Sequence, residues 1–426
     1  MIANFSVANY RSISEEQTIS FLTTPDKHNR DLIAVEVAKG VYINKLAIFF
    51  GANASGKSNI LQGIEALFML MCSPTKDKNS PIMEYCPFKL ENSSPTRMKV
   101  DFYAEGKHYW YEITFDREKI LEENLYYTPK RNRSLFYSRK YTGVDSQPEI
   151  DFGTTLGFSL KTKESLREST FNNHSVLSTV AKLSLKDDAA ALKTLYNWVM
   201  NHVHNINGDY PNRLFVTKLN KINSDERKKE FYIRLLSKAD FNITGFRLVD
   251  KRGRYPKEMV EDILNDRNFS EDRRIAMFHD VVFTNHSMLG DFEIPLEFQS
   301  KGTTRFIELL EILYDLVSDN HIYFLDELGN QMHYDLIVFY ILLFLYNSEE
   351  SQMLFTSQSI LLLDEDFVRR DIVYLSEKDP ETAATTYERV SDMGLHKNLS
   401  LYNAYRIGKL GSRPELGSPY LNLKKK

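Results

Sequence analysis

The stretch of residues 49–58 constrains this chain more than any other, because it fits a phosphate-binding loop. Residues 51–58 read Gly-Ala-Asn-Ala-Ser-Gly-Lys-Ser, which matches the pattern G-x-x-x-x-G-K-[ST]. An apolar run over residues 45–50 precedes the match, and a helical pattern follows it. The backbone N–H groups of such a loop face the phosphates of a nucleotide at the N-terminus of a helix, where the helix dipole favours anions. The strand, the loop and the helix together predict a nucleotide site.

The pattern assigns roles to the residues of the loop. We expect Lys57 to reach the β- and γ-phosphates and Ser58 to coordinate Mg²⁺. The remaining contacts to the nucleotide are expected from the small and polar residues around them: Gly51, Asn53, Ala54, Ser55, Gly56 and Asn59. The alternative, a glycine-rich turn that binds nothing, would not need the flanking strand and helix that this motif requires.

A second motif, residues 321–327, places two acids after four apolar residues in a row. Such a run is typical of a buried strand that ends in a polar loop. Asp326 is suited to holding Mg²⁺ through water, and Glu327 is suited to orienting or deprotonating the attacking water. An acidic pair after an apolar strand also occurs by chance, so its meaning depends on the phosphate loop upstream.

A third motif, residues 297–306, lies just before the helix that leads to the acidic strand. Ser300 and Gly302 place a hydroxyl group and a bare backbone at the start of that helix, which again suits an anion. Taken alone, this turn is only a helix N-cap. Its position in the chain order, after the phosphate loop and before the acidic strand, points to a nucleotide.

Composition sets the broad class of the chain. Its 426 residues, with 42% hydrophobic and 26% charged side chains, are enough for two or three packed units. The net charge of −4 gives no global electrostatic case for nucleic acid. Two cysteines, Cys72 and Cys86, make no disulfide framework and indicate a reducing, cytoplasmic compartment. The longest apolar run, residues 336–346, is shorter than the ~20 residues of a membrane span, and residues 1–14 do not resemble a secretion signal.

The periodicity predicts an α/β chain in three consecutive parts. Residues 1–155 contain the phosphate loop and an antiparallel β lobe, residues 156–280 have a helical pattern, and residues 281–426 return to strands. The expected strands of the first part are residues 2–7, 16–21, 45–50, 98–104, 109–115 and 121–127, and the clearest helices of the second are residues 187–203 and 224–239.

The order of these motifs resembles the ABC-type ATPase heads of the SMC, RecF and Rad50 group. Within that group it is similar to bacterial AAA-type phage-defence ATPases: the RloA or AbiLi type, the PARIS and Septu ATPases, and the ATPase half of the OLD nucleases. Residues 9–13, 87–90, 326–333 and 404–416 carry this resemblance at both ends of the chain. It implies an ABC-type ATPase head with a mixed sheet, an antiparallel β lobe and a helical insertion.

The resemblance also implies an ATP sandwich between two subunits, with ATP and Mg²⁺ as cofactors. The phosphate loop of one subunit would hold ATP, and Ser300 with Gly302 of a second subunit would close over the γ-phosphate. Arg11 would contact phosphate or ribose, and Asn330 and His333 would lie at the subunit junction. The expected assembly is a homo-oligomer of head-to-head dimers or a higher ring.

One departure from the family concerns the switch position. Relatives often read Thr-Thr-His-Asn where this chain reads Thr356-Ser357-Gln358-Ser359. Gln358 can hydrogen-bond phosphate or water, but it does not change charge near neutral pH as histidine does. We therefore expect slow hydrolysis, with Glu327, Lys57 and Gln358 as the catalytic residues.

The resemblance implies a sensor or scaffold subunit of an antiphage, abortive-infection system. About fifty residues follow Glu377 without a cluster of acids, so the expected effector is a separate Toprim-like or HNH-like nuclease released by a phage-derived trigger. The alternatives are a RecF- or Rad50-like DNA-repair ATPase that clamps DNA and, more distantly, the ATP-binding subunit of a membrane transporter.

A basic stretch, residues 126–140, bears on nucleic acid. Its five basic residues could meet the phosphates of DNA or RNA, or the acids of a partner; they are Lys130, Arg131, Arg133, Arg139 and Lys140. The plainer interpretation is a solvated pair of strands beside a turn, because charge runs without a groove are usually surface.

Overall fold

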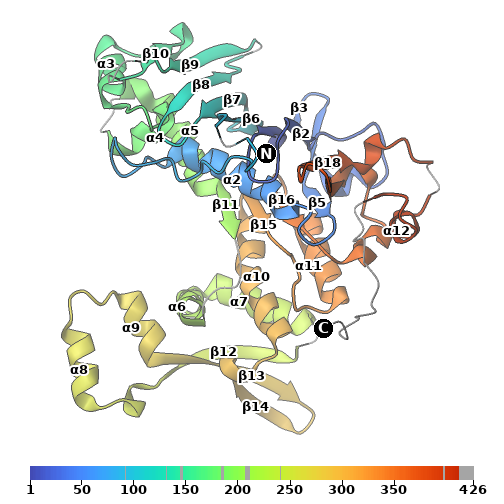
Figure 1. The fold of residues 1–426 in the computed structure, drawn as a ribbon. Helices are drawn as coiled ribbons and strands as arrows, with labels where there is room; N and C mark the ends of the chain where they lie inside the picture. Colours follow the sequence, from blue (N-terminus) through green and yellow to red (C-terminus); the bar gives the residue numbers. More distant parts are fainter. Residues whose placement is uncertain are drawn as a thin grey trace, which may run out of the picture. The chain divides into compact units, whose positions relative to one another are not determined.

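The computed structural model describes residues 1–91, 93–130, 132–143, 147–183, 187–206, 212–239, 241–396 and 399–411. Arg131 of the basic stretch and residues 412–416 of the expected C-terminal motif lie outside these ranges. The chain divides into two compact units (Figure 1). The first comprises Met1–Ile206, His321–Asp326 and Glu350–Lys426, and the second comprises Asn207–Asn320 and Glu327–Glu349. The sequence predicts three consecutive parts, whereas each of these two units is built from separate segments of the chain. The acidic strand belongs to the first unit, and the helices on either side of it belong to the second.

A seven-stranded antiparallel sheet in the first unit forms the expected β lobe. Its order is β10-β9-β8-β7-β6-β1-β2. Buried and solvent-facing residues alternate along β6, where Met98, Val100 and Phe102 are buried, and this alternation is the period-2 pattern of a half-buried strand. Glu105 and Gly106 both have positive φ and form the two-residue turn between β6 and β7. The strands are β1 (Ile2–Ala8), β2 (Gln17–Ser20), β6 (Thr96–Ala104), β7 (Lys107–Phe115), β8 (Ile120–Tyr127), β9 (Ser134–Lys140) and β10 (Glu149–Phe152).

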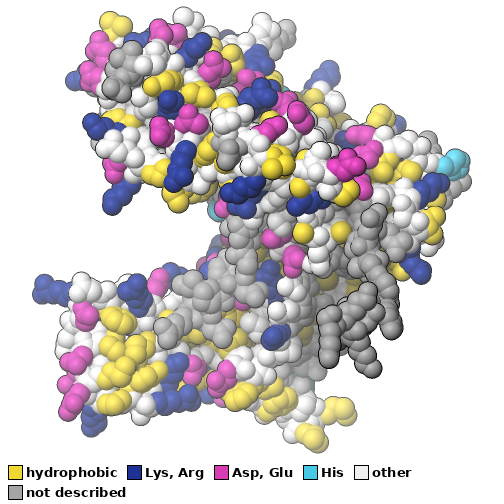
Figure 2. Space-filling view, in the orientation of Figure 1, with side chains coloured by type: hydrophobic (Ala, Val, Ile, Leu, Met, Phe, Trp, Pro, Cys, Tyr) yellow, Lys and Arg dark blue, Asp and Glu magenta, His cyan; other side chains and the backbone are white. Residues whose placement is uncertain are grey.

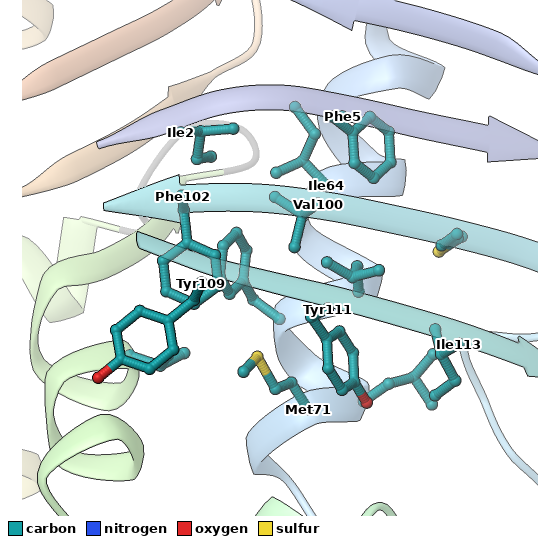
Figure 3. Packing of buried hydrophobic residues seen from close by; sticks show 14 of the residues in the cluster. Ile2, Phe5, Ile64, Met71, Val100, Phe102, Tyr109, Tyr111 and Ile113 are labelled. Carbon is teal, nitrogen blue, oxygen red and sulfur yellow. The ribbon is translucent and has the colours of Figure 1, made fainter. Parts of the chain in front are cut away.

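The main core of the first unit lies between this sheet and helix α2 (Lys57–Cys72). Figure 3 shows Phe5, Phe102 and Tyr111 of the sheet on the same side as Ile64 and Met71 of the helix. All five side chains are buried. Because α2 starts at the phosphate loop, the packing of its apolar face fixes the position of that loop against the lobe.

A six-stranded sheet in the first unit positions the candidate site. Its order is β11-β15-β16-β5-β17-β18, and neighbouring strands are parallel except for the antiparallel pair β17–β18. The strands β5, β15 and β16 lie side by side, so the loops that follow them emerge at one edge of the sheet, where open α/β sheets bind ligands. The strands are β5 (Leu46–Phe50), β11 (Val203–Ile206), β15 (Ile322–Leu325), β16 (Gln352–Thr356), β17 (Val373–Lys378) and β18 (Thr385–Arg389).

The remaining elements of the first unit are short or cover these sheets. They are the hairpin β3 (Ala34–Ala38) and β4 (Val41–Asn44), with helices α1 (Arg30–Ile33), α3 (Leu160–Ser169), α4 (Val176–Thr179), α5 (Ala190–His202) and α12 (Leu401–Arg406).

The second unit packs helices on a three-stranded antiparallel sheet, β12-β13-β14. Strand β12 falls within the range for which the sequence indicates helices. Its buried residues Ile243 and Phe246 are three apart, so the strand lacks the strict alternation that sequence patterns detect. The elements are β12 (Ile243–Asp250), β13 (His279–Ser287) and β14 (Gly290–Pro295), with α6 (Asn212–Asn223), α7 (Glu226–Lys238), α8 (Lys257–Asn265), α9 (Glu271–Phe278), α10 (Lys301–Ser318) and α11 (Tyr334–Asn347).

Exposed apolar side chains occur on the second unit. Figure 2 shows hydrophobic side chains over α8 and at the turn between β13 and β14; the large exposed ones there include Met259, Leu264, Met288 and Leu289. Among the helices in the described ranges, none combines the length and the apolar character that crossing a membrane takes.

Candidate nucleotide-binding site

The phosphate loop joins β5 to α2, as its motif predicts. Ala54 (φ 63°) and Gly56 (φ 96°) take the left-handed conformation that turns the chain back into the helix. The Lys57 ammonium group donates 2.9 Å hydrogen bonds to the carbonyl oxygens of Gly51 and Ala52. Lys57 is therefore folded over its own loop, where its charge can serve an anion held by the loop.

Three hydroxyl and carboxylate groups converge beside the start of α2. Ser58 Oγ donates a 2.7 Å hydrogen bond to Asp326 Oδ1, and Thr356 Oγ1 donates one of 2.6 Å to the same oxygen. The sequence predicts Ser58 and Asp326 as metal ligands, and the structure brings them together. A hydroxyl and a carboxylate oxygen are hard ligands of the kind that Mg²⁺ prefers. Across the described residues, no group of three or more His, Cys, Asp or Glu side chains could hold a metal ion.

The hairpin β17–β18 contacts the phosphate loop through Ser376, Thr385 and Tyr387, which together are called the brace below. Ser55 Oγ and Ser376 Oγ are 2.6 Å apart, and Thr385 donates a 2.9 Å hydrogen bond to the Ser55 carbonyl oxygen. Tyr387 donates a 2.6 Å hydrogen bond to the carbonyl oxygen of Gly56. Two of these three bonds are accepted by carbonyl groups of the loop, those of Ser55 and Gly56, so the hairpin fixes the loop backbone just before α2.

The start of the chain completes this brace. Ser12 Oγ lies 2.7 Å from Thr385 Oγ1 and accepts a 2.6 Å hydrogen bond from the Asn59 amide. The Ser12 carbonyl oxygen also accepts a 2.7 Å hydrogen bond from the Thr385 backbone N–H. Residues from three distant parts of the chain therefore meet around one loop.

Two glycines of the loop have no room for a side chain. A Cβ atom at Gly51 would lie 2.3 Å from Ser376 Oγ, and one at Gly56 would lie 2.5 Å from Thr385 Oγ1. The motif requires glycine at these places, and here the reason is close contact with the brace.

Other predicted nucleotide contacts lie around the loop. Asn53 and Ala54 are exposed at its outer turn. Arg11 is also exposed; its backbone N–H donates to the Cys86 carbonyl oxygen at 2.6 Å, and its Nε donates to the Tyr10 hydroxyl at 3.2 Å. Arg11 directly precedes Ser12, which belongs to the brace, so its head group is tied to the same part of the first unit.

The switch residue Gln358 follows the end of β16. Thr356 pairs with Phe49 of β5, and Ser357 donates a 3.0 Å backbone hydrogen bond to the Phe49 carbonyl oxygen. Gln358 is exposed just beyond them. Its position places a neutral amide at the sheet edge that carries the phosphate loop.

The remaining predicted residues belong to the second unit. Ser300 is the N-cap of α10 and accepts a 3.0 Å hydrogen bond from the Thr303 backbone N–H. His333 caps α11 in the same way, accepting from the Asp335 backbone N–H at 3.3 Å. A Cβ atom at Gly302 would lie 3.0 Å from the Gln331 carbonyl oxygen. The turn at Ser300 is thus a helix N-cap, as one reading of the sequence has it.

Glu327 begins the turn that follows the acidic strand. It has φ 52°, in the left-handed region that non-glycine residues rarely adopt. Asn330 donates a backbone hydrogen bond of 3.1 Å to the Glu327 carbonyl oxygen, which closes the turn. Backbone strain of this kind clusters at functional sites and is consistent with a constrained role for Glu327.

Three basic residues of the stretch, Arg133, Arg139 and Lys140, have protein partners in the structure. Arg139 is fully buried, and its guanidinium donates to the carbonyl oxygens of Ile120, Phe171 and Asn172. Lys140 lies 3.6 Å from Glu122, and Arg133 lies 3.9 Å from Glu112. These contacts match the plainer interpretation, a pair of strands beside a turn.

Comparison with solved structures finds SMC head domains among the similar chains. An SMC head bound to the C-winged helix domain of ScpA has a TM-score of 0.42 at 13% identity and covers 95% of this chain and 99% of its own. The SMC head domain from Thermotoga maritima has a TM-score of 0.41 at 12% identity, covering 91% and 98%. An SMC head from Pyrococcus furiosus, with an extended coiled coil and bound to the C-terminal domain of ScpA, has a TM-score of 0.38 at 12% identity, covering 96% and 98%.

A family model places the chain. No curated protein matches it. The family of AAA domains described as "putative AbiEii toxin, Type IV TA system" matches residues 46–364. This range starts with the strand before the phosphate loop and includes the acidic strand and the switch position. The match covers well over half of the chain, and the protein therefore belongs to this family of AAA-type ATPase domains.

Proposed function

We propose that this chain is an ATP-binding and hydrolysing sensor or scaffold subunit of an antiphage, abortive-infection system, and that it controls a separate toxic effector. The observation that carries the ATPase part is the convergence of Ser58 and Asp326 beside Lys57. The family description, which refers to a toxin–antitoxin system, supports the defence part.

The residues that follow strands β5, β15 and β16 would divide the work on ATP. The loop N–H groups and Lys57 would bind the phosphates, and Ser58 with Asp326 would hold Mg²⁺. When bound, Mg²⁺ neutralises charge on the phosphates and orients them for in-line attack. Glu327 would orient or deprotonate the attacking water, and Gln358 would hold water or phosphate without changing charge. The neutral amide is our reason to propose slow turnover.

A second copy would complete the site. Ser300 and Gly302 lie at the start of α10, where backbone N–H groups are free of intrahelical partners and suit a γ-phosphate. Asn330 and His333 would lie at the junction of the two copies. ATP would then close head-to-head dimers or a higher ring, and a phage-derived trigger would change this closure. The effector that responds would be a Toprim-like or HNH-like nuclease in the cytoplasm.

Two substitutions test this proposal together. Lys57→Ala should abolish ATP binding and protection against phage, because the loop loses the cation that meets the phosphates. Glu327→Gln should keep ATP binding, lose hydrolysis and accumulate an ATP-dependent oligomer, measured by light scattering after size-exclusion chromatography. Hydrolysis at the parental rate by Glu327→Gln would refute the assignment of Glu327.

Addition of DNA to the same assay separates the proposed role from its rival. A DNA-repair ATPase that clamps DNA should hydrolyse ATP faster when DNA is present. A defence scaffold should show no such stimulation. Strong stimulation would overturn the defence role while leaving the ATP site intact.

A further inference from the structure

Thr356 lies outside the phosphate-loop motif, and the motif assigns no role to its side chain. It is the last residue of β16 and is fully buried. Its hydroxyl donates a 2.6 Å hydrogen bond to Asp326 Oδ1, the oxygen that also accepts from Ser58. We propose that Thr356 is a positioning residue that holds the Asp326 carboxylate in the orientation that Mg²⁺ requires. This inference rests on the proposed ATP and Mg²⁺ site.

The sheet makes Thr356 a rigid support. Strand β16 lies between β15, which ends just before Asp326, and β5, which leads into the phosphate loop. Leu325 pairs with Phe355, and Thr356 pairs with Phe49. The Thr356 backbone is therefore fixed by both neighbouring strands, and threonine has few side-chain rotamers in a strand. A donor held in this way restricts rotation of the carboxylate it bonds.

The arrangement also leaves the metal ligands available. Thr356 and Ser58 both donate to Oδ1, so Oδ2 can accept from water bound to the metal. The Ser58 hydroxyl donates its hydrogen bond to Asp326, so the lone pairs of the Ser58 oxygen can face the metal. Thr356 would then keep the Asp326 carboxylate aligned when the Ser58 oxygen binds Mg²⁺. Partners that hydrogen-bond a metal-binding side chain in this way tune metal affinity about 10–100-fold.

The plainer interpretation is that Thr356 merely satisfies a buried hydroxyl. A buried hydroxyl without a partner costs roughly 1–3 kcal/mol, so almost any acceptor would do. That interpretation predicts lower stability on removal of the hydroxyl but no specific effect on Mg²⁺. The two interpretations therefore separate in the metal dependence of nucleotide binding.

The test measures binding of a fluorescent ATP analogue while Mg²⁺ is titrated, and again with the metal chelated. Thr356→Val keeps the shape of the side chain and removes the donor. We expect it to need about 10–100-fold more Mg²⁺ for half-maximal enhancement of binding, with unchanged affinity in chelator. Thr356→Ser, which keeps the hydroxyl, should restore the parental Mg²⁺ dependence.

A matched control is Thr170→Val. Thr170 is also fully buried, and its hydroxyl donates a 2.7 Å hydrogen bond to the Leu166 carbonyl oxygen, away from the phosphate loop. It should bind the analogue with the parental Mg²⁺ dependence. If Thr356→Val does not fold, Thr356→Ala is compared with Thr356→Ser, since these two differ only in the hydroxyl group.

The outcomes are distinguishable. An unchanged Mg²⁺ requirement in the variant without the hydroxyl overturns the role of Thr356. Nucleotide binding by the parent that does not depend on Mg²⁺ overturns it as well. Failure of the parent to bind the analogue at all would instead refute the proposed ATP site.

Discussion

Tyr387 donates a 2.6 Å hydrogen bond from its phenol group to the carbonyl oxygen of Gly56, although 331 residues separate the two in the chain. Burial raises the pKa of the Tyr387 phenol, so the group remains a donor at any physiological pH. The bond fixes the last loop residue before α2 begins. The conformation of the phosphate loop thus depends on a strand near the other end of the chain.

Tyr387→Phe should weaken nucleotide binding, because it removes this bond and leaves the Gly56 carbonyl group without it. A hydrogen bond of this kind contributes about 0.5–1.5 kcal/mol, which corresponds to a roughly 2- to 12-fold rise in the dissociation constant for ATP. Calorimetric titration with ATP measures the effect. Tyr42→Phe is the control: Tyr42 donates to Glu36 on the exposed β3–β4 hairpin, so its removal should leave the dissociation constant unchanged. Equal affinities for ATP in the parent, Tyr387→Phe and Tyr42→Phe would show that the Tyr387 hydrogen bond does not support the phosphate loop.

Gly56→Ala should damage the site through both a close contact and backbone strain. The alanine Cβ atom would meet Thr385 Oγ1 at 2.5 Å, and φ of 96° is strained for any residue but glycine. Gly40→Ala is a matched control, since Gly40 also has positive φ (77°) but open space within 4 Å. We expect Gly40→Ala to cost about 1–2 kcal/mol of stability, from backbone strain alone.

The comparison of the two glycine variants isolates the close contact. Gly56→Ala should lower the thermal unfolding midpoint further than Gly40→Ala and should abolish ATP binding, which Gly40→Ala keeps. Similar midpoints and intact ATP binding in both variants would show that the loop moves away from Thr385 without loss.

The local signals explain what the sequence could predict. Residues 51–58, the apolar strand before them and the helix after them are contiguous, so the motif predicts the loop between β5 and α2. The hairpin between β6 and β7 is likewise contiguous, with Glu105 and Gly106 at its turn. Asp326 and Ser58 are far apart in the chain, but each follows an apolar strand. Their meeting was predictable from the rule that parallel strands end at one edge of a sheet.

The partners of the loop carry no such signal. Ser376, Thr385 and Tyr387 are common residues in an ordinary hairpin, and only the pairing of β17 with β5 brings them behind the loop. For Arg139, the sequence indicates a surface role that the structure does not bear out. In the sequence it belongs to a basic stretch, but its side chain alternates to the buried face of β9, where Glu123 lies 4.0 Å away.

Arg139→Met should therefore be strongly destabilising. The variant would leave the buried Glu123 without its cation, although Tyr111 and Tyr137 still donate to that carboxylate. Removing one partner of a buried pair typically costs about 3–5 kcal/mol. Lys140→Met is the matched control, because Lys140 and Glu122 are exposed and such pairs contribute about 0–1 kcal/mol. Thermal unfolding midpoints measure both, and a midpoint for Arg139→Met equal to that of the control would contradict this account.

His174 should make the stability of the first unit sensitive to acid. Burial, with a smaller contribution from Lys182, lowers the pKa of His174 from 6.5 to about 4. The unfolded chain then binds this proton more readily than the folded chain, so stability is complete above pH 6.5 and is lost as pH falls towards 4. The full shift corresponds to at most about 3 kcal/mol. The neighbouring Ser175 donates a hydrogen bond to the Met71 carbonyl oxygen at the end of α2, so protonation would loosen the support of the helix that carries the loop.

The test compares the pH dependence of unfolding in the parent and in His174→Gln. Glutamine has no charge to gain, so the variant should lose less stability than the parent between pH 6.5 and about 4. A constant difference between the two proteins is expected above pH 6.5, where His174 is neutral in both states. Because carboxylates also titrate in this range, the informative quantity is how the difference in stability between the two proteins changes with pH. Parallel curves from pH 6.5 down to about 4 would show that His174 does not contribute to the acid sensitivity.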